Sequence, residues 1–540
     1  MKKSLLALCM ALTVLLSGCT GFSDYVKQLQ NGLKNQMMIG DVVSFRDMEY
    51  TRPDMGQVEA TLQESCRLAA EAETVEEVMD GVYAFYDVYD GFCTNINLAN
   101  IYYSRDLTDL YWEQEYSFCL EQTATVDAAL EELYYALADS PHREALESET
   151  YFGADYFDAY DGETIWDEMF LSLLEQEAAL QDRYYELSSQ ALETEYYSQE
   201  FFTAYSPQMA QLFVELIALR QQIAAYVGYD SYPEFAYDFY YARDYTPAQA
   251  EAYMQDIGTE LSGLYRQLCV SDVWDGAAEY CSEADTFSYV RAAAFAMGGT
   301  VEEAFNLLAQ AELYDISYSA NKYDASFEAY LWSYYEPFIF MNPTMGQDDK
   351  LKFAHEFGHF VNDYISYGSY AGMDVSEVHS QTMEFMSLCY GSDTEYLTRY
   401  KMADCLCTYV EQSAYALFEQ QVYSLTGEEL TAENVQALYE RIGTEFGLDS
   451  WGWDSRDFVT ITHLYTNPMY ITSYVVSNDL ALQIYQLEQA EAGKGLKVFQ
   501  DCLLSTDSYI LQFAQTYGLE SPFAEGRLQS VKEMLTAALG

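Results

Sequence analysis

Apolar residues recur at intervals of three and four along most of the N-terminal half of the chain. This spacing places them on one face of an α-helix, so it predicts long amphipathic helices. We expect such helices at Val75–Tyr89, Leu110–Ala138, Ile165–Tyr197 and Gln208–Val227. This half contains no run of alternating apolar and polar residues, which is the pattern of a half-buried strand. The fold is therefore predicted to be mainly α-helical.

Two histidines in the segment Ala354–Phe360 suggest a metal site. His355 and His359 are four residues apart, so on a helix their rings lie one turn apart and can bind one metal ion. Neutral imidazoles at this spacing suit Zn²⁺, and Glu356 is placed to take a proton from a water molecule on the metal. The chain has only five histidines, so a chance occurrence of this pattern is improbable. The alternative is an amphipathic helix with two core histidines.

A second helical segment offers carboxylates for the remaining metal position. Catalytic zinc usually has three protein ligands and one water molecule. After a turn-rich break, the run Asp374–Met386 carries Glu377 and Glu384, which are seven residues apart and share one face of a helix. Carboxylates on a largely apolar helix need a partner, and the metal ion is one.

These two motifs together resemble the thimet oligopeptidase and oligoendopeptidase F family of zinc peptidases. The matching residues are His-Glu-Phe-Gly-His at 355–359 and Ser-Glu-Val-His-Ser-Gln-Thr-Met-Glu at 376–384. The resemblance implies that Glu377 is the third ligand of a single Zn²⁺ and that Glu384 supports the site. It covers about residues 208–515 and is weak before Leu180. Two further matches, Arg220–Ala224 and Tyr241–Thr246, are interpreted as family markers more than as chemistry.

A third segment, Thr462–Ser477, is similar to the His-then-Tyr segment of the family. Pro468 ends one helix and begins another, which places Tyr470 and Tyr474 one turn apart on the same face. Their hydroxyl groups can donate to the oxyanion of a tetrahedral intermediate, and the resemblance makes His463 and Tyr474 catalytic and Tyr470 substrate-binding. The alternative is that these tyrosines are core residues, because the chain has 52 tyrosines.

A short β-prone run precedes the predicted zinc helix. Phe338–Met341 lie in the sequence Glu-Pro-Phe-Ile-Phe-Met-Asn and predict a small β element beside that helix. In zinc peptidases an edge strand in this place can pair with the substrate backbone. Phe338, Ile339 and Phe340 are therefore candidate substrate-binding residues. A buried core strand is the equal alternative.

The first residues predict export and a lipid anchor. Lys2 and Lys3 precede an apolar run from Leu5 to Leu16 that is too short to span a bilayer, and Ser-Gly-Cys follows. This pattern resembles a bacterial lipoprotein signal, which implies cleavage before Cys19 and lipidation of that cysteine. A signal peptide that is cut elsewhere is the alternative. We expect the mature protein on the extracytoplasmic side of the bacterial cell membrane, held there by its lipid only.

The chain is strongly acidic, with a formal net charge of −62 and a pI near 4.1. This charge repels nucleic acids and anionic lipids and attracts cationic peptides, although it also serves solubility outside the cell. Apolar residues make up 50% of the chain, which is enough for a sizeable core. No Gly/Ser-rich tract marks a flexible boundary between domains.

Four parts of the chain follow from these patterns. Residues 1–18 are the signal peptide, 19–45 a lipid-anchored tether with a first helix, 46–207 an N-terminal helical lobe, and 208–540 the zinc metallopeptidase catalytic region. The resemblance implies two helical lobes that flank a deep channel, which admits unstructured peptides and excludes folded proteins.

The predicted function is zinc-dependent hydrolysis of internal bonds in short peptides outside the cytoplasm. A related zinc carboxypeptidase or dipeptidyl carboxypeptidase on a similar fold is one alternative. A catalytically silent, lipid-anchored peptide-binding protein is another. Loss of Glu356 or of a metal ligand would be the signature of that protein, and all four residues are present.

Overall fold

The computed structural model describes residues 42–539, apart from 162–166, 192–197, 278, 369–370, 393 and 506. Within these ranges the chain is mainly helical and contains one three-stranded sheet, which confirms the predicted fold class. The predicted signal peptide and Cys19 lie outside the described residues. None of the helices in the described ranges is long and apolar enough to cross a bilayer.

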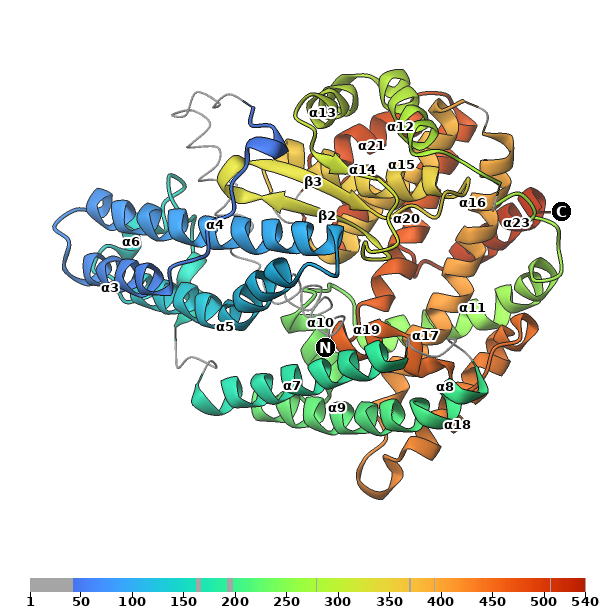
Figure 1. Ribbon diagram of the computed structural model, residues 1–540, viewed down its shortest axis with the longest axis horizontal. Helices are drawn as coiled ribbons and strands as arrows, with labels where there is room; N and C mark the ends of the chain where they lie inside the picture. The colour runs from blue at the N-terminus through green and yellow to red at the C-terminus, as the bar shows by residue number, and fades with distance from the viewer. Residues whose placement is uncertain are drawn as a thin grey trace.

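The N-terminal lobe is a layer of helices with a hydrophobic core of its own (Figure 1). Polar residues directly before its long helices cap their first turns: Asp54, Thr74 and Asp109 accept hydrogen bonds from backbone N–H groups. The elements of this lobe are α3 (Met55–Glu71), α4 (Val75–Arg105), α5 (Leu110–Ala138), α6 (Arg143–Leu146) and η2 (Tyr156–Tyr160), whereas η1 (Phe45–Asp47) places Phe45 in the larger core described below.

Helix α5 has the predicted bounds, whereas α4 continues past the predicted end at Tyr89 to Arg105. The prediction ended too early because polar residues in the second half of α4 interrupt the periodic spacing of apolar residues. These polar residues contact the sheet. Asn97 Nδ2 donates to Tyr330 O at 2.8 Å, and Arg105 pairs with Asp315 at 2.6 Å. Helix α4 therefore connects the N-terminal lobe to the rest of the molecule.

The rest of the chain forms a larger second core. Helices α7 (Glu168–Ala191) and α8 (Gln199–Ala204) belong to it, although the sequence analysis placed them in the N-terminal lobe. The side chains of Phe170 and Phe201 are buried in this larger core, because α7 and α8 pack against α9 (Ser206–Tyr226). The other helices around this core are α10 (Tyr232–Phe239), α11 (Pro247–Leu268), α12 (Glu283–Met297), α13 (Gly299–Gln310), α16 (Glu395–Cys407), the π-helix η4 (Thr408–Gln412), α17 (Ser413–Val422), η5 (Gly427–Glu429), α18 (Ala432–Phe446), η6 (Leu448–Trp451), η7 (Asp457–Thr460), α21 (Lys494–Cys502), α22 (Ile510–Thr516) and α23 (Arg527–Leu539).

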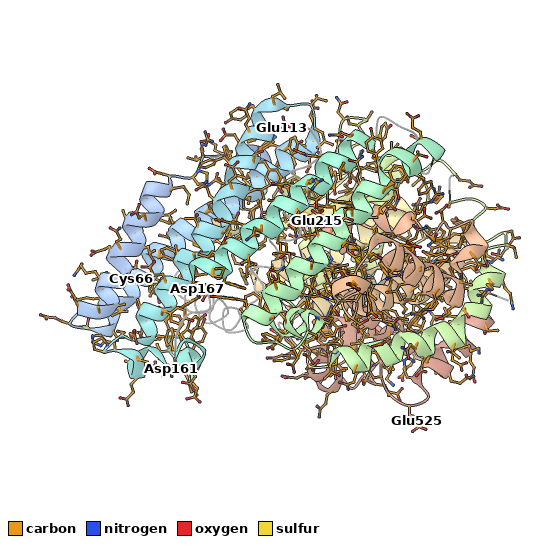
Figure 2. The ribbon with its side chains drawn as sticks, turned by 90° about the horizontal axis from the view of Figure 1, so that it is seen from below. Cys66, Glu113, Asp161, Asp167, Glu215 and Glu525 are labelled. Carbon is orange, nitrogen blue, oxygen red and sulfur yellow. The ribbon has the colours of Figure 1, made fainter. Side chains whose placement is uncertain are left out.

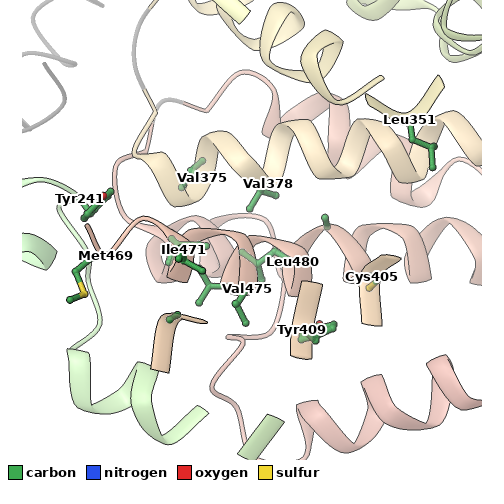
Figure 3. Packing of buried hydrophobic residues seen from close by; sticks show 14 of the residues in the cluster. Tyr241, Leu351, Val375, Val378, Cys405, Tyr409, Met469, Ile471, Val475 and Leu480 are labelled. Carbon is green, nitrogen blue, oxygen red and sulfur yellow. The ribbon is translucent and has the colours of Figure 1, made fainter. Parts of the chain in front are cut away.

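Three helices in the middle of this body carry the predicted site. They are α14 (Asp349–Ser366), α15 (Met373–Tyr390) and α20 (Ile471–Ala490), and the short α19 (Thr462–Thr466) precedes α20. Helix α15 packs against both α14 and α20. Figure 3 shows apolar side chains of α15 and α20, among them Val375 and Ile471, in the contact between these two helices.

The sheet corrects the predicted substrate-binding strand. The strand order is β1–β3–β2, so β3 is central, and it pairs in parallel with β1 and antiparallel with β2. Phe338, Ile339 and Phe340 lie in β3 and are fully buried. Their continuous apolar run is typical of a strand covered on both faces. The edge-strand prediction is therefore wrong, and the alternative of a buried core strand is correct. The strands are β1 (Tyr314–Asp315), β2 (Ser326–Leu331) and β3 (Glu336–Met341).

The few basic residues are distributed unevenly between interior and surface. The chain has 25 lysines and arginines against 87 acidic residues. Acidic side chains such as Asp161 and Glu525 point outward at the periphery in Figure 2. Several basic side chains are instead buried and paired with carboxylates, namely Arg220 with Glu177, Arg243 with Asp374, Lys322 with Asp315, Lys401 with Glu384, and Arg527 with Asp479.

Candidate metal centre and active site

His355, His359 and Glu377 meet where α14 contacts α15. One ligand atom from each side chain lies within 4.8 Å of the other two. His355 Nε2 lies 3.4 Å from Glu377 Oε2. Two donors on a tetrahedral Zn²⁺ with bonds of about 2.1 Å are about 3.4 Å apart, so this donor set fits a zinc ion. The structure therefore brings together the three predicted ligands.

Gly358 permits the close contact between α14 and α15. A Cβ atom on Gly358 would lie 2.6 Å from Ser380 Cα and 2.8 Å from His379 O. Any larger residue would push the two helices apart, because both of these atoms belong to the backbone of α15. Since the histidines lie on α14 and Glu377 on α15, this contact lets the carboxylate reach the imidazoles.

Hydrogen bonds at Nδ1 orient both imidazoles. His355 Nδ1 lies 2.9 Å from Glu384 Oε1, and His359 Nδ1 lies 3.2 Å from Ser376 Oγ. Each Nε2 is thereby left for a metal ion. Burial opposes protonation of His355, but the hydrogen bond with Glu384 and the charge of Glu377 outweigh it and raise the pKa to about 9. Burial lowers the pKa of His359 to about 4.

A buried lysine that the sequence analysis missed holds Glu384 in place. Lys401 Nζ lies 2.7 Å from Glu384 Oε2 and 2.9 Å from Asp404 Oδ2, and its side chain is 3% exposed. Burial raises the pKa of Glu384, but Lys401 and His355 together hold it below its usual value. Glu384 therefore joins His355 to a fixed positive charge. No local pattern marks Lys401, because it is a lone lysine on another helix.

Glu356 lies beside the metal triad. Ser326 on β2 donates a hydrogen bond of 2.7 Å to Glu356 Oε1, and Glu356 is 6% exposed. Burial raises the pKa of Glu356, while the charge of His355 and the bond from Ser326 oppose this rise. The carboxylate is thus held next to the metal position, where it can accept a proton.

His463, Tyr470 and Tyr474 form an aromatic group next to Glu377. The rings of Tyr470 and Tyr474 are 5.1 Å apart, as expected for one helical turn. Tyr474 OH lies 3.4 Å from His463 Nε2. Tyr470 OH donates to Glu377 Oε1 at 2.6 Å, so this predicted substrate-binding residue contacts a metal ligand. Burial lowers the pKa of His463 to about 4 and raises that of Tyr474, which keeps the imidazole neutral and the phenol protonated at pH 7.

The open edge of the sheet runs past Glu356. Strand β2 pairs with β3 alone among the described residues, and Asn342 N donates to Ala325 O. In this antiparallel register the backbone groups of Ser326 and Glu328 point away from β3. Farther along, Asn97 covers Tyr330 O. Next to Glu356, β2 therefore offers the stretch of free backbone that the sequence analysis assigned to β3.

Comparisons with known proteins show similarity to peptidases in the N-terminal region and in the overall fold. Residues 45–162 match the family model of the Peptidase M3 N-terminal domain. A protein described as an oligoendopeptidase F has a TM-score of 0.79 at 21% identity, over 92% of this chain and 98% of its own. PZ peptidase A with an inhibitor has a TM-score of 0.78 at 18% identity, and the match covers 92% of this chain and 99% of that one. A protein described as an oligoendopeptidase F from Bacillus anthracis has a TM-score of 0.75 at 20% identity, and the match covers 93% of this chain and 98% of that one. No curated protein matches.

The predicted resemblance to oligoendopeptidase F peptidases is confirmed by the family model and by the fold. The family model lies within residues 45–162, where the sequence analysis found the resemblance weak. The helices of this region carry no chemical motif, so a single sequence shows only their apolar period.

Proposed function

From an M3-type N-terminal domain on an oligoendopeptidase F fold, we infer that the protein is a peptidase, and we propose that it is a zinc-dependent endopeptidase for short unstructured peptides. The observation that carries this proposal is the triad of His355, His359 and Glu377 with Glu356 beside it. A zinc ion held by the triad would polarise a peptide carbonyl and lower the pKa of a bound water molecule. The channel between two lobes that the resemblance implies stays a prediction.

In the proposed reaction, the protein's own side chains move the proton and stabilise the developing charge. Glu356, held by Ser326, takes a proton from the attacking water and passes it to the leaving amine. The protonated Tyr474 hydroxyl, beside His463, donates to the oxyanion of the tetrahedral intermediate. Tyr470 keeps Glu377 in place through its short hydrogen bond.

We propose that the peptide pairs with the open edge of β2. The free backbone groups of Ser326 and Glu328 lie next to Glu356, so a peptide extended along them presents its backbone to the base. Backbone pairing depends little on side chains, which suits a peptidase of broad specificity. The net charge of −62 adds a preference for cationic peptides.

The location of the protein is a separate proposal that rests on the sequence of its first 19 residues. We propose export and lipidation at Cys19. A Cys19→Ala variant expressed beside the parent chain with a radiolabelled fatty acid tests this proposal. Label on the parent alone would support it, and label on neither would refute it.

The test of the proposed function is incubation of the mature protein with a mixed peptide library, with and without a zinc chelator. Products are identified by mass spectrometry. Internal cuts that disappear with chelator and return with added zinc would support an endopeptidase. Removal of C-terminal residues alone would favour the carboxypeptidase alternative. No cleavage at stoichiometric zinc would favour the peptide-binding protein.

A further inference from the structure

The turn between α19 and α20 has a backbone that needs support from outside. This turn, taken as residues Leu464–Tyr470, comprises the end of α19 and the link to α20, and it joins His463 to the start of the helix that carries Tyr474. Met469 within it has a φ of 69°, in the left-handed region that non-glycine residues rarely adopt. Such a conformation costs free energy and persists only where surrounding groups hold it.

Arg220 on α9 holds the first part of the turn. Its side chain is fully buried, and Nη1 donates to Leu464 O at 2.7 Å while Nη2 donates to Tyr465 O. These carbonyl groups lie at the end of a five-residue helix, which leaves them without intrahelical partners. Glu177 on α7 balances the charge of Arg220 at 2.6 Å.

Arg243 holds the second part of the turn and ties it to α15. Its buried Nη2 lies 3.0 Å from Met469 O and 2.9 Å from Ser473 Oγ. The same group lies 3.4 Å from Asp374, which is three residues before Glu377 on α15. One guanidinium therefore connects the helix of a metal ligand to the first turn of α20.

Two further buried side chains reach the backbone around Met469. Tyr241 OH donates to Pro468 O at 2.8 Å, and Glu419 on α17 accepts from Met469 N at 2.8 Å. Figure 3 shows Tyr241 beside Met469 at the start of α20. The left-handed residue is thus held on both its N–H and its carbonyl group by side chains from other elements.

We infer that Arg220, Tyr241, Arg243 and Glu419 are positioning residues that clamp this turn and so fix His463 and Tyr474 relative to Glu377. The inference rests on the proposed function. It assigns roles to Arg220, Tyr241 and Arg243, which the sequence analysis interpreted as family markers, and to Glu419, which it did not single out. A displacement of about 1 Å in a catalytic group can lower a rate by about 10²-fold, so a clamp at this place matters for turnover.

The test compares Arg243→Gln with Arg527→Gln. Arg527 is also buried and pairs with a carboxylate of α20, Asp479, at 3.0 Å, but its hydrogen bonds go to Asp479 and Gln486 and not to the turn. Zinc content, thermal stability, kcat and KM, and amide hydrogen exchange are measured for both variants. Arg243→Lys tests rescue, because it restores the charge.

For Arg243→Gln we expect kcat about 10- to 100-fold lower, KM within about threefold of the parent value, and full zinc content. Exchange at residues 464–477 should accelerate. Arg527→Gln should lose comparable stability and retain kcat, and Arg243→Lys should recover part of the lost kcat. The milder Tyr241→Phe, which removes one hydroxyl group, should change the same quantities in the same direction and serves if Arg243→Gln does not fold.

Three results would overturn the clamp: an unchanged kcat in Arg243→Gln, a loss that follows zinc content, or an equal loss in Arg527→Gln. If the parent protein cleaves no peptide, the proposed function fails, and hydrogen exchange alone decides on the clamp. Faster exchange at 464–477 in Arg243→Gln would then support it, and unchanged exchange would refute it.

Discussion

At the scale of single residues, Glu356 is the side chain on which the proposed chemistry depends most directly. Glu356→Gln keeps the volume and the contact with Ser326, but the amide cannot take up a proton. We expect unchanged zinc content and a kcat lowered by about 10³-fold or more. Metal analysis and peptide turnover measure the two quantities. Retained turnover would exclude Glu356 as the base.

Lys401 gives a prediction about metal affinity instead of turnover. Lys401→Met removes the charge that balances Glu384, which then holds His355 less firmly. We expect the affinity for zinc to fall about 10- to 100-fold, measured by competition with a chelating dye. Lys322→Met is the matched control, because Lys322 is equally buried and pairs with Asp315 in the sheet. An equal loss of affinity in both variants would contradict the role of Lys401.

At the scale of elements, the contact of α14 with α15 at Gly358 can be tested with two glycines. The added Cβ of Gly358→Ala meets the backbone of α15 at 2.6 Å, whereas Gly263 on α11 has open space around it. We expect Gly358→Ala to lose about 1–3 kcal/mol of stability and to bind zinc more weakly. Gly263→Ala should gain up to about 1 kcal/mol through helix propensity. Denaturant unfolding measures both, and a Gly358→Ala protein as stable as its parent would contradict the close contact.

Elements with a strong local signal could be predicted from the sequence. The apolar period defined α5, the spacing of His355 and His359 located the site, and the family resemblance added Glu377. Periodicity could not show whether Phe338–Met341 form a central or an edge strand, because strand order depends on distant pairing. Lys401 was missed, since its partner Glu384 lies on another helix and a single buried charge leaves no pattern in its own neighbourhood. Arg243 was noticed only as part of a family match, because its partners lie on other elements and its contacts cannot be seen in the sequence.

For the whole molecule, carboxyl groups that are buried or half-buried predict how stability varies with pH. Burial raises the pKa of Asp90, Asp127 and Asp363 to about 7 and that of Glu419 to about 8. From about pH 4 to 8 these four carboxyl groups bind more protons in the folded protein than in the unfolded chain. His359 and His463, whose pKa values burial lowers to about 4, oppose this below about pH 6.5, but they are fewer, so stability falls as pH rises through this window. Below about pH 4 stability also falls, because Asp315, whose pKa is about 2, pairs with buried Lys322 despite its own burial.

We expect the highest Tm near pH 4 and a decline toward pH 8, measured by thermal scans. Asp127 lies in the N-terminal lobe. Asp127→Asn removes one of the carboxyl groups with a raised pKa and keeps the size of the side chain. The difference in Tm between this variant and the parent should shift in favour of the variant as pH increases from 5 to 8. A parent Tm that climbs steadily to pH 8 would refute the prediction.

The negative charge of the whole molecule predicts how salt affects substrate preference. Attraction between the protein and a cationic peptide weakens as salt screens it. We expect a higher kcat/KM for a cationic peptide than for an anionic peptide of the same length at low salt. This ratio should shrink toward one as salt increases, and a ratio that is independent of salt would contradict steering by charge.

The pairing of the few basic residues with carboxylates in the interior has a further consequence for the resistance of the protein to proteolysis. Proteases that cut after lysine or arginine need such a residue in an exposed and flexible stretch of chain. With 25 such residues in 540, and with Arg220, Arg243, Lys322, Lys401 and Arg527 all buried, the folded surface presents few cleavage points to these enzymes. The distribution that holds the site together from within therefore also makes the folded chain a poor target for trypsin-like digestion.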